Sequence, residues 1–449
     1  MTLRSRLSLP RSGATIGAVA TGLLLQATLV VSGVLVARML GPEDRGQLAL
    51  MMVFPLALAQ LIGLGLPLSA TYFISRAREI AGPLTRSLAP LAAAQAVLLL
   101  AVHAGLVVAV FADGEPSASR AAFLTLVVGP VVLCHYYALG ILQGQARYRA
   151  FNLCRLVPFI SYGVAVLAIF ATGGADIEAI AASWSVTYLL GAVVAALVTA
   201  RGLPSGPPAA APPRRELVRF ASKSFVGWVS PVDSFRIDQV VVGLFLSPVA
   251  LGLYVTGLAF TNLPRFIAQS VGVVAYPTVA EKKTPAEARR SMWAFFSGTV
   301  AFSAVTVAVI WVLADWLVPL LFGAAFADAV GLTRILLVSA LLLSARRILT
   351  DAARGAGYAG LGSVAEVVSW VVLVPSVVLL AASSGAAGVA LALVLASAVS
   401  LATLAAGVVI GDRRGTATIN SAEGPATASP LPQSAADIDA SPLGHQSST

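Results

Sequence analysis

Long apolar stretches separated by short polar segments run along almost the whole sequence. A helix that crosses a lipid bilayer needs about 20 largely apolar residues. By that criterion the sequence predicts an all-α polytopic membrane protein with about 12 transmembrane helices in two sets of six. The first set covers residues 14–37, 47–75, 87–112, 121–142, 156–173 and 179–200. The second set covers residues 220–246, 249–280, 292–314, 328–343, 364–382 and 386–410.

Two segments lack this apolar pattern. Residues 201–219 are rich in proline and arginine and separate the two sets. Residues 412–449 are mostly small or polar, and such a composition buries too little apolar surface to offset the entropy cost of ordering. We therefore expect an N-terminal six-helix lobe over 1–200, a cytoplasmic linker over 201–219, a C-terminal six-helix lobe over 220–411, and a disordered cytoplasmic tail over 412–449.

Composition agrees with a chain immersed in lipid. Hydrophobic residues make up 58% of the sequence and charged residues only 11%, whereas a soluble domain carries about a quarter charged residues. A net charge of +9 raises the question of nucleic acid. The basic residues, however, fall in short clusters between apolar stretches and form no RNA- or DNA-binding motif. We therefore expect membrane lipid, and no nucleic acid, as the surroundings of this chain.

The arrangement of the basic residues predicts an orientation. Of the 29 Lys and Arg residues, Arg236 and Arg265 lie inside predicted helices. The connections on one predicted side hold only Arg38, Arg45, Arg120 and Arg334, and the opposite side holds all the others. Cytoplasmic connections are the ones enriched in Lys and Arg. This distribution predicts that both termini are cytoplasmic.

The two sets of helices are related to each other. Residues 40–46 and 246–252 share the pattern Leu-x-Pro-x-x-x-Gly at an offset of 206 residues, so that Pro42 corresponds to Pro248 and Gly46 to Gly252. The same offset brings each first-set helix close to a second-set helix. Repeats of six helices have the same orientation in the membrane, which predicts a pseudo-twofold axis along the membrane normal and a cavity between two lobes.

Several short motifs resemble the polysaccharide-biosynthesis flippases of the multidrug/oligosaccharidyl-lipid/polysaccharide exporter superfamily. They are residues 37–46 after the first helix, 142–148 with Asn152-Leu153, 236–239 with 252–254, Tyr276-Pro277, and 321–323. The resemblance covers about residues 14–410. It implies a two-lobed bundle that carries an undecaprenyl-pyrophosphate-linked glycan outward across a bacterial cytoplasmic membrane by alternating access. It also implies polysaccharide assembly proteins as partners and, for coupling, a cation such as H+ or Na+.

Ionisable residues inside the predicted helices are the first candidates for a site. Asp233, Arg236 and Asp238 lie on the seventh helix and Glu366 lies on the eleventh. Each costs about 2.5–3.5 kcal/mol in a bilayer, so we expect them to face a cavity or one another. Asp233 and Arg236, three residues apart, share a helix face and form either a structural ion pair or part of the cavity. Asp238 lies on another face, where coupling or glycan contact is expected.

Two further arginines complete the set of candidates. Arg265 follows Pro264 near the middle of the eighth helix. A guanidinium binds phosphate in a bidentate manner, so Arg265 is predicted to contact the pyrophosphate; pairing with Asp238 or Glu366 is the alternative. Arg38, at the outer end of the first helix, is either a cavity residue or an anchor at the membrane interface.

Other classes of function receive less support. The sequence has no Gly-x-x-x-x-Gly-Lys-Ser/Thr loop and too few histidines for a metal site, so no ATPase activity, cofactor or enzymatic function is expected. An ion-coupled multidrug or small-molecule antiporter of the same superfamily is the first alternative. It should carry a carboxylate early in the first helix, and that helix has none. A membrane glycosyltransferase, or a non-transport component of polysaccharide assembly, would need paired carboxylates and a substantial exposed domain.

Overall fold

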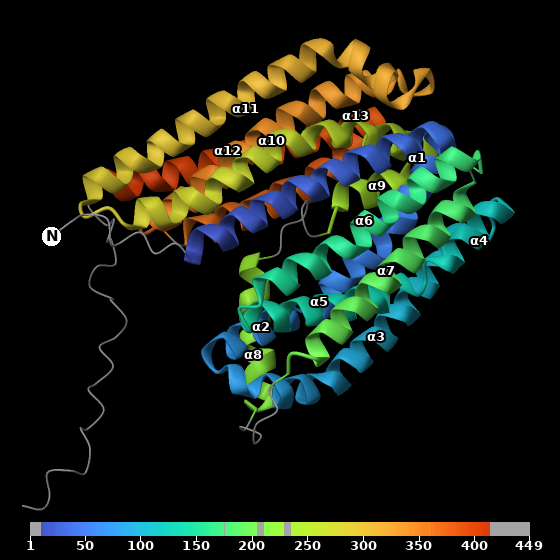
Figure 1. Cartoon of the computed structure of the whole chain (residues 1–449). Helices are drawn as coiled ribbons and strands as arrows, with labels where there is room; N and C mark the ends of the chain where they lie inside the picture. Colours follow the sequence, from blue (N-terminus) through green and yellow to red (C-terminus); the bar gives the residue numbers. More distant parts are fainter. Residues whose placement is uncertain (1–9, 175, 204–210, 229–234, 359, 414–449) are drawn as a thin grey trace, which may run out of the picture.

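The computed structural model describes residues 10–174, 176–203, 211–228, 235–358 and 360–413, and these residues form helices and short connections without strands. Figure 1 shows two helical bundles that meet at one end of the molecule and diverge toward the other. The first lobe comprises α1 (Pro10–Gly63), α2 (Leu66–Arg76), η1 (Arg78–Ile80), α3 (Ala81–Phe111), α4 (Pro116–Leu124), α5 (Val128–Gly144), α6 (Tyr148–Thr172) and α7 (Ile177–Ala200).

The second lobe repeats this order. It comprises α8 (Arg214–Trp228), α9 (Ile237–Phe245), α10 (Pro248–Ala280), α11 (Pro285–Phe322), η2 (Ala324–Phe326), α12 (Ala329–Gly355) and α13 (Leu361–Arg413). Most of the predicted tail, residues 414–449, and the middle of the predicted linker, residues 204–210, lie outside the described residues.

Bends divide the longest helices into membrane-spanning segments. Among the described residues, eight helices are long and apolar enough to cross a bilayer, and two of them, 43 and 50 residues long, each contain two predicted spans. The first bends at Gly41, where φ is +73°, and the second bends at Gly385. Helix α10 and the α8–α9 segment correspond to the eighth and seventh predicted helices. The expected all-α fold of about 12 transmembrane helices is thus confirmed.

The second predicted helix is broken where a continuous helix was expected. Leu64 and Gly65 have φ values of +47° and +72°, so α1 ends at Gly63 and α2 begins at Leu66. A left-handed conformation costs a non-glycine residue about 1–2 kcal/mol, so this break is a strained point of the backbone. The break lies within a segment of suitable length for one span, and backbone irregularity at such a depth is tolerated where it is covered by protein or lines a cavity.

The tenth predicted helix is longer than expected. It was predicted to end at residue 343, but α12 continues to Gly355. Arg346, Arg347 and Arg354, which the sequence placed in a connection, are therefore helical residues. Their charges made the segment look unsuitable for a membrane helix, because burying a charge costs free energy. The carboxylate partners described below offset part of that free energy.

The lobes are in closest contact where the two Leu-x-Pro-x-x-x-Gly motifs meet, and we call this region, residues 41–46 and 247–252, the sealed end. A Cβ at Gly46 would overlap the carbonyl oxygen of Pro248, and a Cβ at Gly252 would overlap that of Pro42. The two contacts are equivalent under the 206-residue offset, which is what a pseudo-twofold axis between the lobes requires. Buried residues from both lobes, including Leu48 and Leu251, form one continuous core beside this contact.

Candidate functional site

Arginine side chains gather between α10 and α12 in the second lobe. Arg265 lies near the middle of α10, half-buried, and its charge acts on those of Arg346 and Arg347 on α12. Like charges held this close within membrane helices repel one another unless anions compensate them. We call Arg265, Arg346, Arg347 and Arg354 the cationic cluster.

One member of the cationic cluster is held by a buried ion pair. Arg346 Nη1 lies 2.6 Å from Glu366 Oε2 of α13, with only 11% and 19% of the two side chains exposed. The same guanidinium donates to the hydroxyl of Ser400, which in turn donates to the carbonyl oxygen of Ala365. The other carboxylate oxygen of Glu366 is buried and has no hydrogen-bond partner among the described residues. Glu366, predicted as a cavity residue, thus pairs with Arg346.

A second carboxylate contacts the other two arginines of α12. Asp351 Oδ2 accepts from Arg347 Nε at 3.0 Å, and Asp351 Oδ1 lies 3.8 Å from Arg354 Nη1. Arg265 of α10 adds its positive charge to this region. Several guanidinium groups brought together in this way make the region suitable for a multiply charged anion.

Asp238 lies in a separate buried site at the start of α9. Only 1% of the residue is exposed, and its Oδ2 accepts a hydrogen bond of 3.0 Å from the hydroxyl of Tyr254 on α10, itself fully buried. Its Oδ1 is buried without a hydrogen-bond partner among the described residues. A buried carboxylate oxygen that lacks a donor can take up a proton or a cation.

Arg236 points away from its own lobe. It adopts a left-handed conformation with φ of +48° immediately before α9, and its side chain is exposed. Its charge acts on the hydroxyl groups of Tyr136 and Tyr188, which belong to α5 and α7 of the first lobe. Arg236 therefore lies on the surface that the second lobe turns toward the first. The predicted pair with Asp233 lies outside the described residues.

Arg38 lies against the last turn of α11. Its Nε donates to the carbonyl oxygen of Leu321 at 2.7 Å, and its Nη2 donates to that of Leu320. The final carbonyl groups of a helix lack partners within the helix and favour cations. Arg38 thus joins the first span to the second lobe close to the sealed end.

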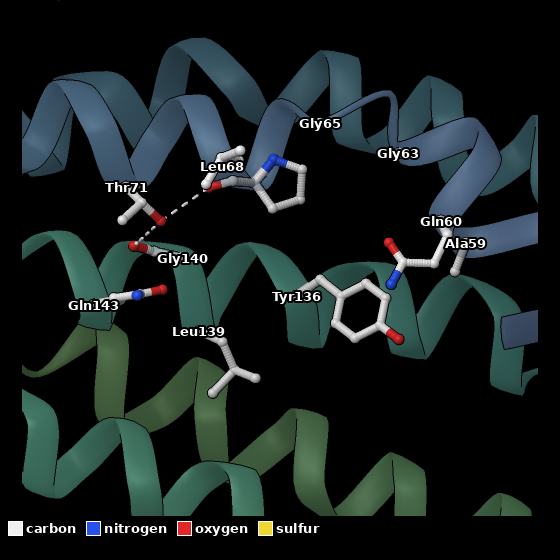
Figure 2. Close-up of a pocket in the computed structure, with 11 residues that line it drawn as sticks. Ala59, Gln60, Gly63, Gly65, Leu68, Thr71, Tyr136, Leu139, Gly140 and Gln143 are labelled. Atoms are coloured by element: carbon white, nitrogen blue, oxygen red, sulfur yellow. Dashed lines mark hydrogen bonds between the residues drawn. The ribbon is translucent and has the colours of Figure 1, made fainter. Parts of the chain in front are cut away.

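A pocket lies in the first lobe at the break between α1 and α2, as Figure 2 shows. It encloses about 710 Å³, part of it open to the surroundings, between the broken helix and α5. The polar side chains that line it are those of Gln60, Thr71, Tyr136 and Gln143, and none of its lining residues is charged. Thr71 donates to the carbonyl oxygen of Gly140 at 2.9 Å and so joins the two walls.

The sequence did not predict Arg346 as a site residue, nor this pocket. Arg346 was assigned to a connection, although Glu366 inside a neighbouring predicted helix needed a cationic partner. The pocket had a local signal in Gly63-Leu64-Gly65, because two glycines close together in a predicted span favour a break.

Solved structures with a similar fold are transporters. The chain resembles "Lipid II flippase MurJ, inward closed conformation" with a TM-score of 0.69 at 13% identity, covering 87% of this chain and 86% of that one. It resembles an inward-facing multidrug resistance MATE family transporter of the MOP superfamily with a TM-score of 0.67 at 18% identity, covering 88% and 96%. An outward-facing MATE transporter scores 0.59 at 16% identity, covering 90% and 94%. These likenesses show the fold.

The family follows from the sequence. Among curated proteins, none matches this chain. Residues 14–283, well over half of the 449, match the family described as "Polysaccharide biosynthesis protein". With the helical bundle and its transporter fold, this match shows that the chain is a multi-pass membrane protein of the polysaccharide biosynthesis protein family.

Proposed function

We propose that this chain moves a polyprenyl-pyrophosphate-linked oligosaccharide across a bacterial cytoplasmic membrane for cell-surface polysaccharide synthesis. The two lobes alternate between access from either side, and the end at which they diverge in Figure 1 faces the cytoplasm together with both termini. The sealed end faces outward in this conformation. Polysaccharide assembly proteins supply the glycan and receive it.

The observation that carries this proposal is the group of four arginines on α10 and α12 of the second lobe, the cationic cluster. A pyrophosphate is the part of a lipid-linked glycan with the highest charge, and it must be stabilised where water is scarce. Planar guanidinium groups match phosphate oxygens in pairs, so Arg265 and Arg346 are suited to hold it. A group of arginines suits an anionic substrate better than the organic cations of a drug antiporter, so the cluster also favours this proposal over its rival.

Asp238 is the proposed coupling group. Protonation, or binding of Na+, would neutralise its buried carboxylate beside Tyr254, and the Arg236 guanidinium two residues earlier lies between that site and the first lobe. A change of charge at Asp238 is thus placed to alter the contact between the lobes. Arg38, in contrast, is assigned to holding the first span against α11.

The test uses the native host. In cells that lack this gene, we expect the lipid-linked glycan to accumulate and the surface polysaccharide to disappear, and the unaltered gene to reverse both effects. Arg265→Gln should fail to complement, whereas Arg120→Gln, which changes an arginine with 64% of its side chain exposed, should complement fully. Normal polysaccharide in the deletion strain together with increased drug sensitivity would overturn the proposal in favour of the antiporter.

A further inference from the structure

The break between α1 and α2 creates a pocket in which two of the polar side chains have no hydrogen-bond partner among the described residues. The side-chain amides of Gln60 and Gln143 line it, and neither forms a hydrogen bond with another described residue. Figure 2 shows Gln60 and Tyr136 on facing walls near one end and Gln143 near the other. The pocket is partly open to the surroundings, so a ligand larger than the enclosed space can reach its polar groups from outside.

The pseudo-twofold repeat relates this uncharged pocket to the cationic cluster. At the 206-residue offset, Ala59 of the pocket corresponds to Arg265, and Gly140 corresponds to Arg346. The positions that carry guanidinium groups in the second lobe are thus occupied in the first lobe by two of the smallest residues. Equivalent positions therefore carry positively charged side chains in the second lobe and line an uncharged pocket in the first.

One wall of the pocket lies near the second lobe. The Tyr136 hydroxyl is close enough to Arg236 of the second lobe for the two groups to interact electrostatically. The pocket is also partly open to the surroundings, so a ligand beside this wall can enter it. Discontinuous helices in transporters commonly mark the place where substrate binds, and Leu64 keeps its left-handed conformation at the rim of this pocket.

The groups in the pocket select a neutral polar ligand. Amides and hydroxyls donate and accept hydrogen bonds without charge, as a polyhydroxylated sugar ring requires, and an aromatic ring such as Tyr136 offers an apolar face to the ring's C–H groups. A lipid chain would leave the amides unpaired, and a pyrophosphate would find no cation among the lining residues. We propose that this pocket binds sugar residues of the lipid-linked glycan while the cationic cluster binds its pyrophosphate. The inference rests on the proposed function and assigns its glycan subsite.

The test compares two ligands on the purified full chain in detergent. One is polyprenyl pyrophosphate without sugar, and the other is the same lipid carrying a disaccharide of N-acetylglucosamine and a hexose. The pocket variant is Gln60→Ala/Gln143→Ala, which removes both amides without filling the space. Arg265→Gln tests the pyrophosphate site. Thr172→Val is the control, because the hydroxyl of this exposed residue bonds only to carbonyls of its own helix.

We expect the unaltered chain to bind the disaccharide lipid more tightly than the bare lipid. The pocket variant should bind the bare lipid as tightly as the unaltered chain does, but should gain no affinity from the disaccharide. Each amide contributes about two- to tenfold. Arg265→Gln should weaken the binding of both ligands equally, and Thr172→Val should weaken the binding of neither. The melting temperatures of all variants should stay unchanged. If the bare lipid binds and the disaccharide adds nothing, or the gain survives in the pocket variant, the pocket assignment is wrong. If the bare lipid does not bind, the proposed function fails, and this subsite fails with it.

Discussion

Arg346 shows how one side chain serves both the helix that carries it and the site beside it. An unpaired arginine within a membrane helix is costly, and Glu366 offsets that cost through a contact of 2.6 Å. The neighbouring Arg265 adds its positive charge to the region that holds this pair. The local fold and the affinity for anions are therefore coupled at the level of single residues.

Arg265 provides the first prediction. Replacing it with alanine should weaken binding of polyprenyl pyrophosphate by about 10- to 100-fold, the value of a charge-assisted contact. Arg265→Lys should have an intermediate effect, because it keeps the charge but loses the planar pair of donors. Isothermal titration in detergent measures both, with Arg120→Ala as the exposed control. An early-melting Arg265→Ala protein would instead identify Arg265 as a structural residue.

The pair of Arg346 and Glu366 provides the second prediction. Arg346→Ala should destabilise the protein by about 3–5 kcal/mol, because it leaves a buried carboxylate without its partner. The double variant Arg346→Met/Glu366→Leu should recover most of that stability, yet should still bind polyprenyl pyrophosphate poorly. Thermal unfolding and lipid binding are measured on the same samples. Recovery of both stability and binding in the double variant would show that Arg346 has no part in the site.

At the scale of helices, the sealed end depends on two glycines that have no space for a side chain. Gly46 and Gly252 each lie against a backbone carbonyl of the opposite lobe, and backbone cannot move aside as a flexible side chain can. The contact therefore cannot accommodate an added methyl group. Under the proposed alternating access, closure of this end is needed for one of the two states.

The third prediction follows from this packing. Gly46→Ala should hold the sealed end apart and stop transport, whereas Gly33→Ala, which has open space around its Cβ position, should be tolerated. Spin labels at Glu43→Cys and Ser247→Cys, in a chain with Cys134→Ser and Cys154→Ala, report the separation by pulsed electron resonance. A longer distance in Gly46→Ala is expected. An unchanged distance with normal transport would rule out the sealed end as a moving contact.

The sequence predicted the elements better than it predicted the site. Apolar length alone located about 12 helices, because a bilayer demands that property of every span. It could not predict that α12 continues past Arg346, since the partner that permits this, Glu366, belongs to another helix. Nor did apolar length predict the break at Leu64, because this residue is apolar like its neighbours and the local signal lies in Gly63 and Gly65. The partner of Asp238 was likewise a matter of three-dimensional contact, in this case with Tyr254.

The whole molecule consists of two similar lobes that differ in charge at equivalent positions. The second lobe has Arg265 and Arg346 where the first lobe has Ala59 and Gly140, which line an uncharged pocket. Such an arrangement suits a substrate with an anionic part and a neutral part. It also requires that both lobes have the same orientation in the membrane, which the even number of spans in each provides.

The fourth prediction concerns this orientation. Reporter fusions that end after Ser117 should be external, and those that end after Gly206 should be cytoplasmic, because the basic connections should lie inside. At each of the two points, an alkaline phosphatase fusion reports an external position and a green fluorescent protein fusion reports a cytoplasmic one. A cytoplasmic signal after Ser117 would mean that the order of spans is wrong.

Translocation by the purified protein tests the central claim most directly. Vesicles are prepared with the polyprenyl-pyrophosphate disaccharide in both leaflets, and a glycosidase that cannot cross the membrane is added outside. With the unaltered chain present, we expect the enzyme to digest the glycan that began in the inner leaflet as well as that of the outer leaflet. With Arg265→Ala, digestion should stop at the glycan of the outer leaflet, as it does in protein-free vesicles. If the unaltered chain also leaves the inner leaflet undigested, with Na+ and proton gradients of either direction supplied, this protein is not a flippase for lipid-linked glycans.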